Sequence, residues 1–131
     1  MAEEETRLER GTRIVGDVYR GVGSEFLGSL AETCPDLPRF VREFAFGDIY
    51  SRPGLSPRDR EIAIIASLTT LGYAGEEVKA HMQGALNVGV TREELIEVVL
   101  QTVPYAGFPA AIGAMRKLAE IGDEEKRDPQ T

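Results

Sequence analysis

The chain has 131 residues, the length of one domain, and its apolar content of 42% is ordinary for a globular protein. The formal net charge of −7 argues against nucleic acid and anionic membrane surfaces as partners, because both select basic patches. One cysteine excludes an intrachain disulfide and favours a reducing, cytoplasmic compartment. No apolar run approaches the ~20 residues of a membrane-spanning helix, and the acidic residues 1–5 do not resemble a signal peptide.

The apolar residues have helical spacing, and no strand pattern with a period of two is present. A first, weak helix is predicted over residues 6–19, where two glycines interrupt it, and the glycine-rich residues 21–28 are predicted to form a loop. A second helix is predicted over residues 37–49. Pro38 falls in its first turn, where a missing N–H costs nothing.

The third predicted helix follows the capping residue Ser56 and begins at Pro57. Its apolar side chains point in every direction; they are Ile62, Ala63, Ile64, Ile65, Ala66 and Leu68. A helix that is apolar all round has to be buried on every side, and so short a chain has few elements to surround it. We therefore expect a second subunit to cover this helix, with a central helix in a monomeric bundle as the alternative.

Three more helices are predicted after this one. The fourth spans residues 75–87 and has Gly89 as its C-cap. Thr91 caps the fifth helix, Glu94 completes its capping box, and Pro104 is expected to stop it. After a short apolar connection, a sixth helix completes an all-α domain.

The domain is expected to be single, with an ordered core over residues 6–122. Residues 1–6 and 123–131 are polar and are expected to be mobile tails.

The only histidine, His81, follows Glu77 by four residues, so both side chains share one face of the fourth helix. An imidazole beside a carboxylate is a tunable proton donor or acceptor near neutral pH. Both residues lie at the edge of the apolar stripe of this helix. The wall of a half-buried pocket would lie there, but so would the boundary residues of an amphipathic surface helix, and spacing alone leaves both interpretations open.

The other reactive side chains argue against metal and nucleotide chemistry. One histidine and one distant cysteine do not supply the three or four ligands of a zinc site. Cys34 precedes a proline in an apolar stretch and is interpreted as a buried structural thiol. No glycine-rich phosphate-binding loop is present. No metal and no cofactor are expected.

Several motifs in a fixed order resemble the carboxymuconolactone decarboxylase family, and the resemblance covers roughly residues 35–119. The motifs are Phe46-Gly47-Asp48-Ile49-Tyr50-Ser51-Arg52-Pro53-Gly54-Leu55, Arg58-Asp59-Arg60-Glu61, Glu77…His81, Ala85-Leu86-Asn87, Gly89-Val90-Thr91-x-x-Glu94 and Tyr105-Ala106-Gly107-Phe108-Pro109-Ala110-Ala111.

This resemblance implies an AhpD-like helical bundle of about six helices that assembles as a homo-oligomer, as a hexamer first and a trimer second. It implies cofactor-free decarboxylation of γ-carboxymuconolactone to β-ketoadipate enol-lactone in aromatic-acid catabolism. A non-catalytic member that binds a small ligand is the alternative. The related alkylhydroperoxidases carry a C-x-x-C motif where this chain has Ala74 and Glu77, so peroxidase activity is not expected.

Within this implied reaction, His81 would protonate the substrate carbon after loss of CO₂, and Glu77 would orient the imidazole and raise its pKa. Glu61 is a candidate second acid or base. Arginines would bind the substrate carboxylates bidentately. The binding candidates, each of which could instead be a surface charge or a core side chain, are Arg52, Arg60, Tyr105, Phe46 and Tyr50.

Overall fold

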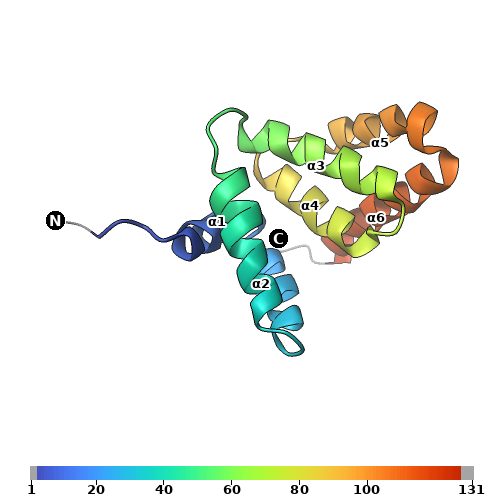
Figure 1. Ribbon diagram of the computed structural model, residues 1–131. Helices are drawn as coiled ribbons and strands as arrows, with labels where there is room; N and C mark the ends of the chain where they lie inside the picture. The colour runs from blue at the N-terminus through green and yellow to red at the C-terminus, as the bar shows by residue number, and fades with distance from the viewer. Residues whose placement is uncertain (1–2, 128–131) are drawn as a thin grey trace. The chain divides into compact units, whose positions relative to one another are not determined.

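The computed structural model describes residues 3–127, with side chains described through residue 122. This part of the chain contains no strand, which confirms the all-α class. Its helices are α1 (Arg7–Ala31), α2 (Asp36–Phe40), the π-helix η1 (Val41–Tyr50), α3 (Pro57–Leu71), α4 (Gly75–Asn87), α5 (Arg92–Ala106) and α6 (Phe108–Arg127) (Figure 1). None of the described helices is long and apolar enough to cross a membrane. The chain forms two compact units, one ending at Pro57 and the other starting at Arg58.

Helix α1 is longer than the sequence suggested, because the predicted loop over residues 21–28 is helical. Thr6 and Glu9 form a capping box at its start. Only Arg20, with φ 56° and ψ −139°, departs from helical geometry. Glycine in a helix costs roughly 0.5–1 kcal/mol relative to alanine. Burial of side chains on both sides of the break, including Tyr19 and Leu27, offsets this local preference.

The first unit is held together by a close backbone approach between α1 and η1. A Cβ atom on Gly11 would overlap the carbonyl oxygen of Arg42 and lie 2.5 Å from its carbon. A Cβ atom on Gly47 would lie 2.5 Å from the carbonyl oxygen of Arg7. Gly11, one of the two glycines expected to interrupt the first helix, is therefore a position where α1 and η1 pack closely. Arg7 also donates to both carboxylate oxygens of Asp48, at 2.9 and 2.7 Å.

The predicted helix over residues 37–49 is present as two consecutive segments, α2 and η1. Phe46 and Tyr50 are buried in η1, and Phe46 packs edge-on against Tyr19 with ring centroids 5.5 Å apart. The prediction of a buried thiol was wrong, because Cys34 is exposed in the segment between α1 and α2. Residues 32–37 are all exposed, so the apolar neighbours in sequence did not imply burial.

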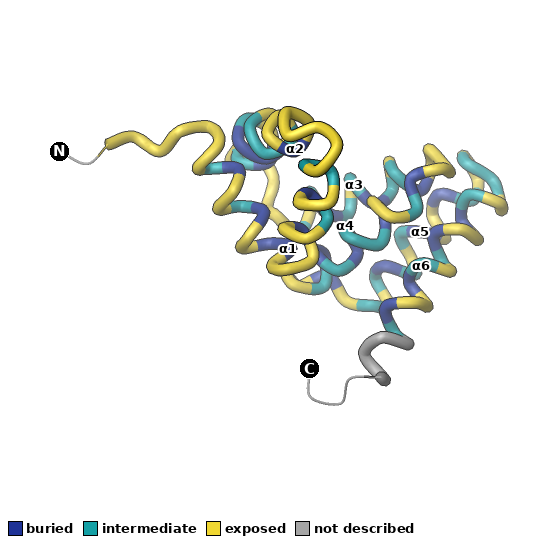
Figure 2. Tube along the Cα trace, turned by 90° about the horizontal axis from the view of Figure 1, so that it is seen from below, coloured by how far each residue is buried: buried dark blue, intermediate teal, exposed yellow. Residues whose placement is uncertain are grey.

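The second unit consists of α3 to α6, and both α4 and α5 pack against α6. Its core contains the fully buried side chains Ile65, Met82, Leu95, Val99 and Leu118. Figure 2 shows buried positions recurring along each of these helices between exposed ones, as expected for helices that each bury one face.

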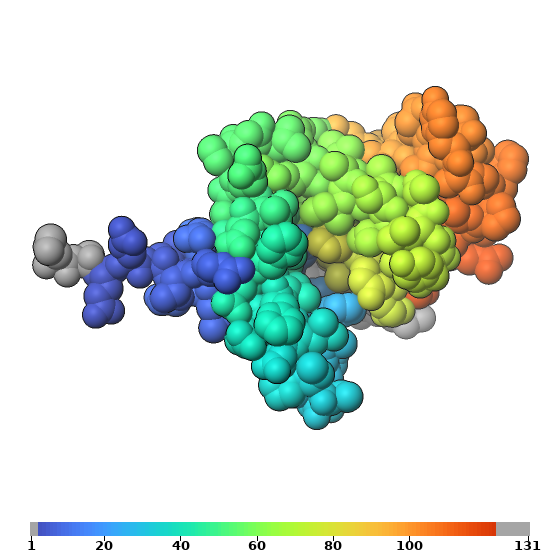
Figure 3. Space-filling model, in the orientation of Figure 1, coloured from blue at the N-terminus to red at the C-terminus, as the bar shows by residue number. Residues whose placement is uncertain are grey.

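Helix α3 buries one face within the chain, formed by Glu61, Ile65 and Thr69. Ala63 and Leu71 are exposed, and four other apolar side chains are partly buried, namely Ile62, Ile64, Ala66 and Leu68. Figure 3 shows α3 in green on the visible surface of the second unit. The chain alone therefore does not bury this helix on every side, and two of its three buried residues are polar.

The predicted boundaries of α4 and the start of α5 are confirmed. Helix α4 spans Gly75–Asn87, and Gly89 follows it with φ +100°. Thr91 and Glu94 form the predicted capping box.

The prediction that Pro104 ends α5 was wrong, because the helix continues through it to Ala106. A proline in the last turn removes a single hydrogen bond, whereas Gly107, at φ 89°, actually reverses the chain. Helix α6 starts at the next residue and extends to Arg127, into the segment expected to be a mobile tail. Of the two expected tails, residues 1–2 and 128–131 lie outside the described residues.

Candidate active site

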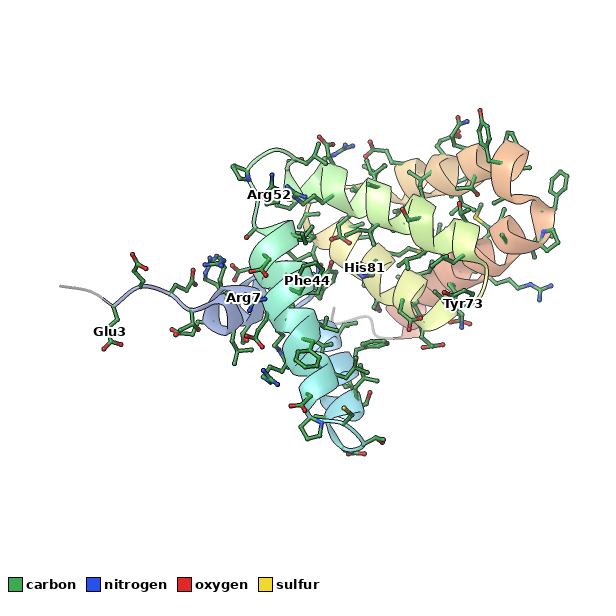
Figure 4. The ribbon with its side chains drawn as sticks, in the orientation of Figure 1. Glu3, Arg7, Phe44, Arg52, Tyr73 and His81 are labelled. Atoms are coloured by element: carbon green, nitrogen blue, oxygen red, sulfur yellow. The ribbon has the colours of Figure 1, made fainter. Side chains whose placement is uncertain are left out.

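A carboxylate from α3 and the imidazole of α4 meet inside the second unit. His81 Nδ1 lies 3.0 Å from Glu61 Oε1. The Glu61 side chain is fully buried, and that of His81 keeps 19% of its surface exposed. Figure 4 labels His81 on α4. The pair therefore has a buried end at the carboxylate and a partly open end at the imidazole.

The sequence suggested Glu77 as the carboxylate that orients the imidazole, and Glu61 as a second acid or base. Glu77 is exposed, and the carboxylate that contacts the imidazole is that of Glu61, twenty positions before His81. Helical spacing indicates only which side chains of one helix share a face. It cannot show that a residue of α3, Glu61, contacts His81 of α4. The pair is thus a tertiary contact between helices rather than a pair along one helix.

Local sequence explains why Glu61 is inside. It belongs to the row Glu61, Ile65 and Thr69, which repeats every four residues and forms the buried face of α3. A carboxylate that shares a row with a core isoleucine is buried with it, and burying a charge requires a hydrogen-bonding partner. This row was the signal in the sequence that could have identified Glu61 as the partner of the histidine.

The geometry suits an imidazole with a defined orientation. With Glu61 ionised, Nδ1–H donates to its carboxylate, and this assignment fixes both the tautomer and the ring plane. Proton transfer to a bound molecule is then a task for Nε2. A carboxylate that orients a histidine in this way is a recurring arrangement in acid–base catalysis.

The predicted binding residues fall into different environments. Arg60 is half-buried and directly precedes Glu61 in α3. The side chain of Tyr105, another binding candidate, is 85% exposed. It lies in the last turn of α5, beyond the last buried position of that helix at Thr102.

The remaining candidates belong to the first unit. Arg52 is exposed there, just after η1. Phe46 and Tyr50 are buried with their ring centroids 5.5 Å apart, and the Tyr50 hydroxyl donates to the Pro57 carbonyl at 3.4 Å. These two side chains form an aromatic core cluster with Tyr19. Among the described residues, no three His, Cys, Asp or Glu side chains gather as a metal site would require.

Comparison with known proteins supports the resemblance that the motifs carry. The chain is 35% identical to 4-carboxymuconolactone decarboxylase of Acinetobacter baylyi, over 87% of this chain and 82% of that protein. It is 34% identical to nitrosuccinic acid decarboxylase of Metarhizium robertsii, over 82% of this chain and 76% of that protein. It is 26% identical to an uncharacterised 15.0 kDa protein of Paracoccus denitrificans, over 76% of this chain and 75% of that protein. Residues 35–120 match the carboxymuconolactone decarboxylase family, to which this chain therefore belongs.

Proposed function

We propose that this chain is a decarboxylase in which His81, oriented by Glu61, protonates the substrate carbon after CO₂ has left. The observation that carries the proposal is the 3.0 Å contact between a fully buried carboxylate and a partly exposed imidazole. The relatives named as decarboxylases, which align over most of the chain, favour a carboxy-lyase over a non-catalytic binding protein.

The substrate that we propose is γ-carboxymuconolactone, on the strength of the relative with 35% identity. The bond between the ring carbon and its carboxylate breaks, CO₂ leaves, and the electron pair moves into the lactone carbonyl to give a dienolate. Protonation at the carbon next to the carbonyl then gives the β-ketoadipate enol-lactone. The lactone carbonyl accepts the electrons itself, so the reaction needs no cofactor.

Each residue of the pair has one task in this scheme. Protonated His81 donates its Nε2 proton to the dienolate carbon, and a positioned acid of this kind contributes ~10²–10⁴-fold in rate. Glu61 accepts the Nδ1 hydrogen bond and stabilises the imidazolium before the transfer. Arg60 remains our proposed carboxylate-binding residue, because a guanidinium pairs bidentately with a carboxylate.

A second substrate is favoured by the relative from Metarhizium robertsii, which is named a nitrosuccinic acid decarboxylase and is nearly as similar to this chain. A nitro group can take up the electron pair released with CO₂, as the lactone carbonyl does. The same pair of residues could protonate the resulting carbon. Nitrosuccinate is therefore the alternative substrate to test.

The experiment measures CO₂ release from both substrates by the wild type and by three variants. His81→Gln keeps a donor for Glu61 but has no titratable imidazole, so we expect kcat to fall by ~10²-fold or more. Glu61→Gln should lower kcat by a smaller factor, because it removes the charge that stabilises the imidazolium. Glu77→Gln is the matched control on the exposed carboxylate and should stay within a few-fold of the wild type.

Normal turnover by a folded His81→Gln variant would refute the assignment of the proton donor. A loss in Glu77→Gln larger than that in Glu61→Gln would refute the orienting role of Glu61. If the wild type releases CO₂ from nitrosuccinate alone, only the substrate is wrong.

A further inference from the structure

A pocket of about 240 Å³ lies in the second unit, between the α3–α4 turn and α6, and we call it the turn pocket. Figure 4 labels Tyr73, one of its lining residues, at this turn. Thr69, another lining residue, follows Glu61 by eight positions in α3, which is about 12 Å along the helix. Neither Glu61 nor His81 lines the pocket. The turn pocket is therefore separate from the candidate active site.

The walls of the turn pocket are apolar and small. Leu68 and Val78 line it from α3 and α4, and Ala110 and Ala114 line it from α6. A Cβ atom on Gly113, which also lines the pocket, would meet no atom within 4 Å, so this wall leaves open space. A cavity of about 150 Å³ is enough to hold benzene, so the turn pocket has room for a ring that carries a substituent. Such walls favour a ligand with a compact apolar body.

Positive charge gathers at one edge of the turn pocket. Helix α4 begins at Gly75, and its N-cap residue Ala74 makes no side-chain hydrogen bond to the helix. Because Gly75 has no side chain, Lys117 of α6 can pass close to it: a Cβ atom on Gly75 would lie 3.0 Å from Cε and 4.0 Å from Nζ of Lys117. All three residues line the pocket. An ammonium group thus lies near the positive end of a helix dipole, and an anion between the two would be favoured by both.

The carboxylates that already pair with Lys117 hold it loosely. Lys117 Nζ lies 3.1 Å from Glu76 Oε1 and 3.5 Å from Glu120 Oε1. The side chain of Glu76 is 73% exposed, and Glu120 is shared with Lys79 at 3.4 Å. Exposed ion pairs of this kind contribute little to stability. An ammonium group has three protons to donate, so a ligand carboxylate can join these partners or replace Glu76, which then stays in water.

The wall of the turn pocket also contains a hydroxyl group without a hydrogen bond. The side chain of Thr69 is buried, with 2% of its surface exposed, and its hydroxyl has no partner in the described chain. Most buried polar side-chain atoms in proteins have a hydrogen-bond partner. Because Thr69 lines the pocket, a polar molecule inside it would be close enough to supply one.

We propose that the turn pocket binds a small aromatic carboxylate, at a site distinct from that of decarboxylation. The ring lies between the apolar walls, and the carboxylate accepts hydrogen bonds from Lys117 Nζ at the start of α4. Tyr73, which is 82% exposed, offers an aromatic face to the bound ring. This proposal does not require the chemistry assigned to His81.

The experiment measures benzoate binding to the full chain by isothermal titration calorimetry, with benzamide as a neutral analogue of the same shape. We expect benzoate to bind the wild type with a Kd of about 1 mM or tighter, as is usual for a ligand of so few atoms. Gly113→Leu fills the pocket and should abolish binding. Lys117→Met should weaken it by ~10-fold, as expected for the loss of a charge-assisted hydrogen bond. Benzamide should bind more weakly than benzoate by a similar factor.

Two control variants match these changes. Gly28→Leu adds the same side chain at an exposed helical position that has no atom within 4 Å. Arg116→Met removes a positive charge directly before Lys117, at an exposed position that does not line the pocket. Both controls should bind benzoate as the wild type does. Circular dichroism should show unchanged helix content in Gly113→Leu, because the added Cβ atom meets no other atom.

A wild type that does not bind benzoate at ~10 mM would overturn the proposal. Wild-type affinity in Gly113→Leu or in Lys117→Met would overturn it too, and so would equal affinities for benzoate and benzamide. His81→Gln distinguishes the two sites: unchanged affinity supports the turn pocket, whereas loss of binding would assign benzoate to the candidate active site and refute the proposal. The titration measures no CO₂ release, so its result is independent of the proposed function.

Discussion

The contact between Gly11 and η1 makes a sharp prediction about the stability of the first unit. In Gly11→Ala, the new methyl group would overlap the carbonyl oxygen of Arg42 and lie 2.5 Å from its carbon. Both obstructing atoms belong to the backbone of a helix, so no side chain can rotate away. The π-helix would have to recede by about 1–2 Å to restore ordinary van der Waals contact, and it packs along α1.

The expected loss follows from two opposing contributions. Overpacking of this kind costs typically 1–3 kcal/mol, and a backbone obstruction belongs at the upper end. The change from glycine to alanine inside a helix by itself stabilises the fold by roughly 0.5–1 kcal/mol. We therefore expect Gly11→Ala to lower the free energy of unfolding by about 2 kcal/mol. Gly16→Ala is the matched control, because this exposed position in α1 has no atom within 4 Å of the added methyl group.

The assay is urea unfolding followed by circular dichroism, combined with hydrogen exchange of the α1 and η1 amides. Gly16→Ala should raise the free energy of unfolding by roughly 0.5–1 kcal/mol. Gly11→Ala should lower it and speed exchange in both helices. If the two alanine variants are equally stable, the close approach does not hold the unit together, and the reasoning is wrong.

Three other predictions concern single side chains. Arg20→Gly should raise the free energy of unfolding by about 1 kcal/mol, because a left-handed conformation strains any other residue, and an unchanged urea midpoint would count against this. Hydrogen bonding to Thr91, and then to Arg58, holds the pKa of Glu94 below its usual 4.5. The ionised side chain therefore stabilises the fold above pH 4.5 and loses this effect as the pH falls through the lowered pKa. Glu94→Gln should be less stable than the wild type at pH 7, and the difference should shrink below pH 4.5; a constant difference down to pH 3 would contradict it. Thr69→Val should unfold at the same or a higher temperature, since the buried hydroxyl has no partner in the described chain, and a loss above ~1 kcal/mol would disprove this.

The features that the sequence predicted well depend on neighbouring residues. Two such features are the capping box of Thr91 and Glu94 and the glycine after α4. Each depends only on residues a few positions away in the chain, so it can be predicted from the local sequence. The glycine-rich residues 21–28 and Pro104 were misjudged for the opposite reason. Local preference disfavours a helix there, but packing and position within the last turn decide the outcome.

The candidate site was predictable in its histidine but not in its geometry. His81 is the only side chain of its type, so composition alone singled it out. Its partner Glu61 lies on another helix, and no spacing rule within α4 could identify it. The exposure of Tyr105 was not predictable either, because an aromatic residue in an apolar segment does not reveal whether the fold turns it inward or leaves it exposed.

The burial of Glu61 against His81 also constrains how this sequence can change over evolutionary time. Removing one member of a buried hydrogen-bonded pair leaves the other without its partner, at a typical cost of about 1–3 kcal/mol. Such a cost is a large part of the 5–15 kcal/mol that keeps an ordinary domain folded. Positions 61 and 81 are therefore expected to be substituted together, and lineages that replace the histidine should also exchange the buried glutamate for an apolar or neutral residue. Sequences in which only one of the two has changed should be rare, or should carry a new polar partner from a neighbouring helix.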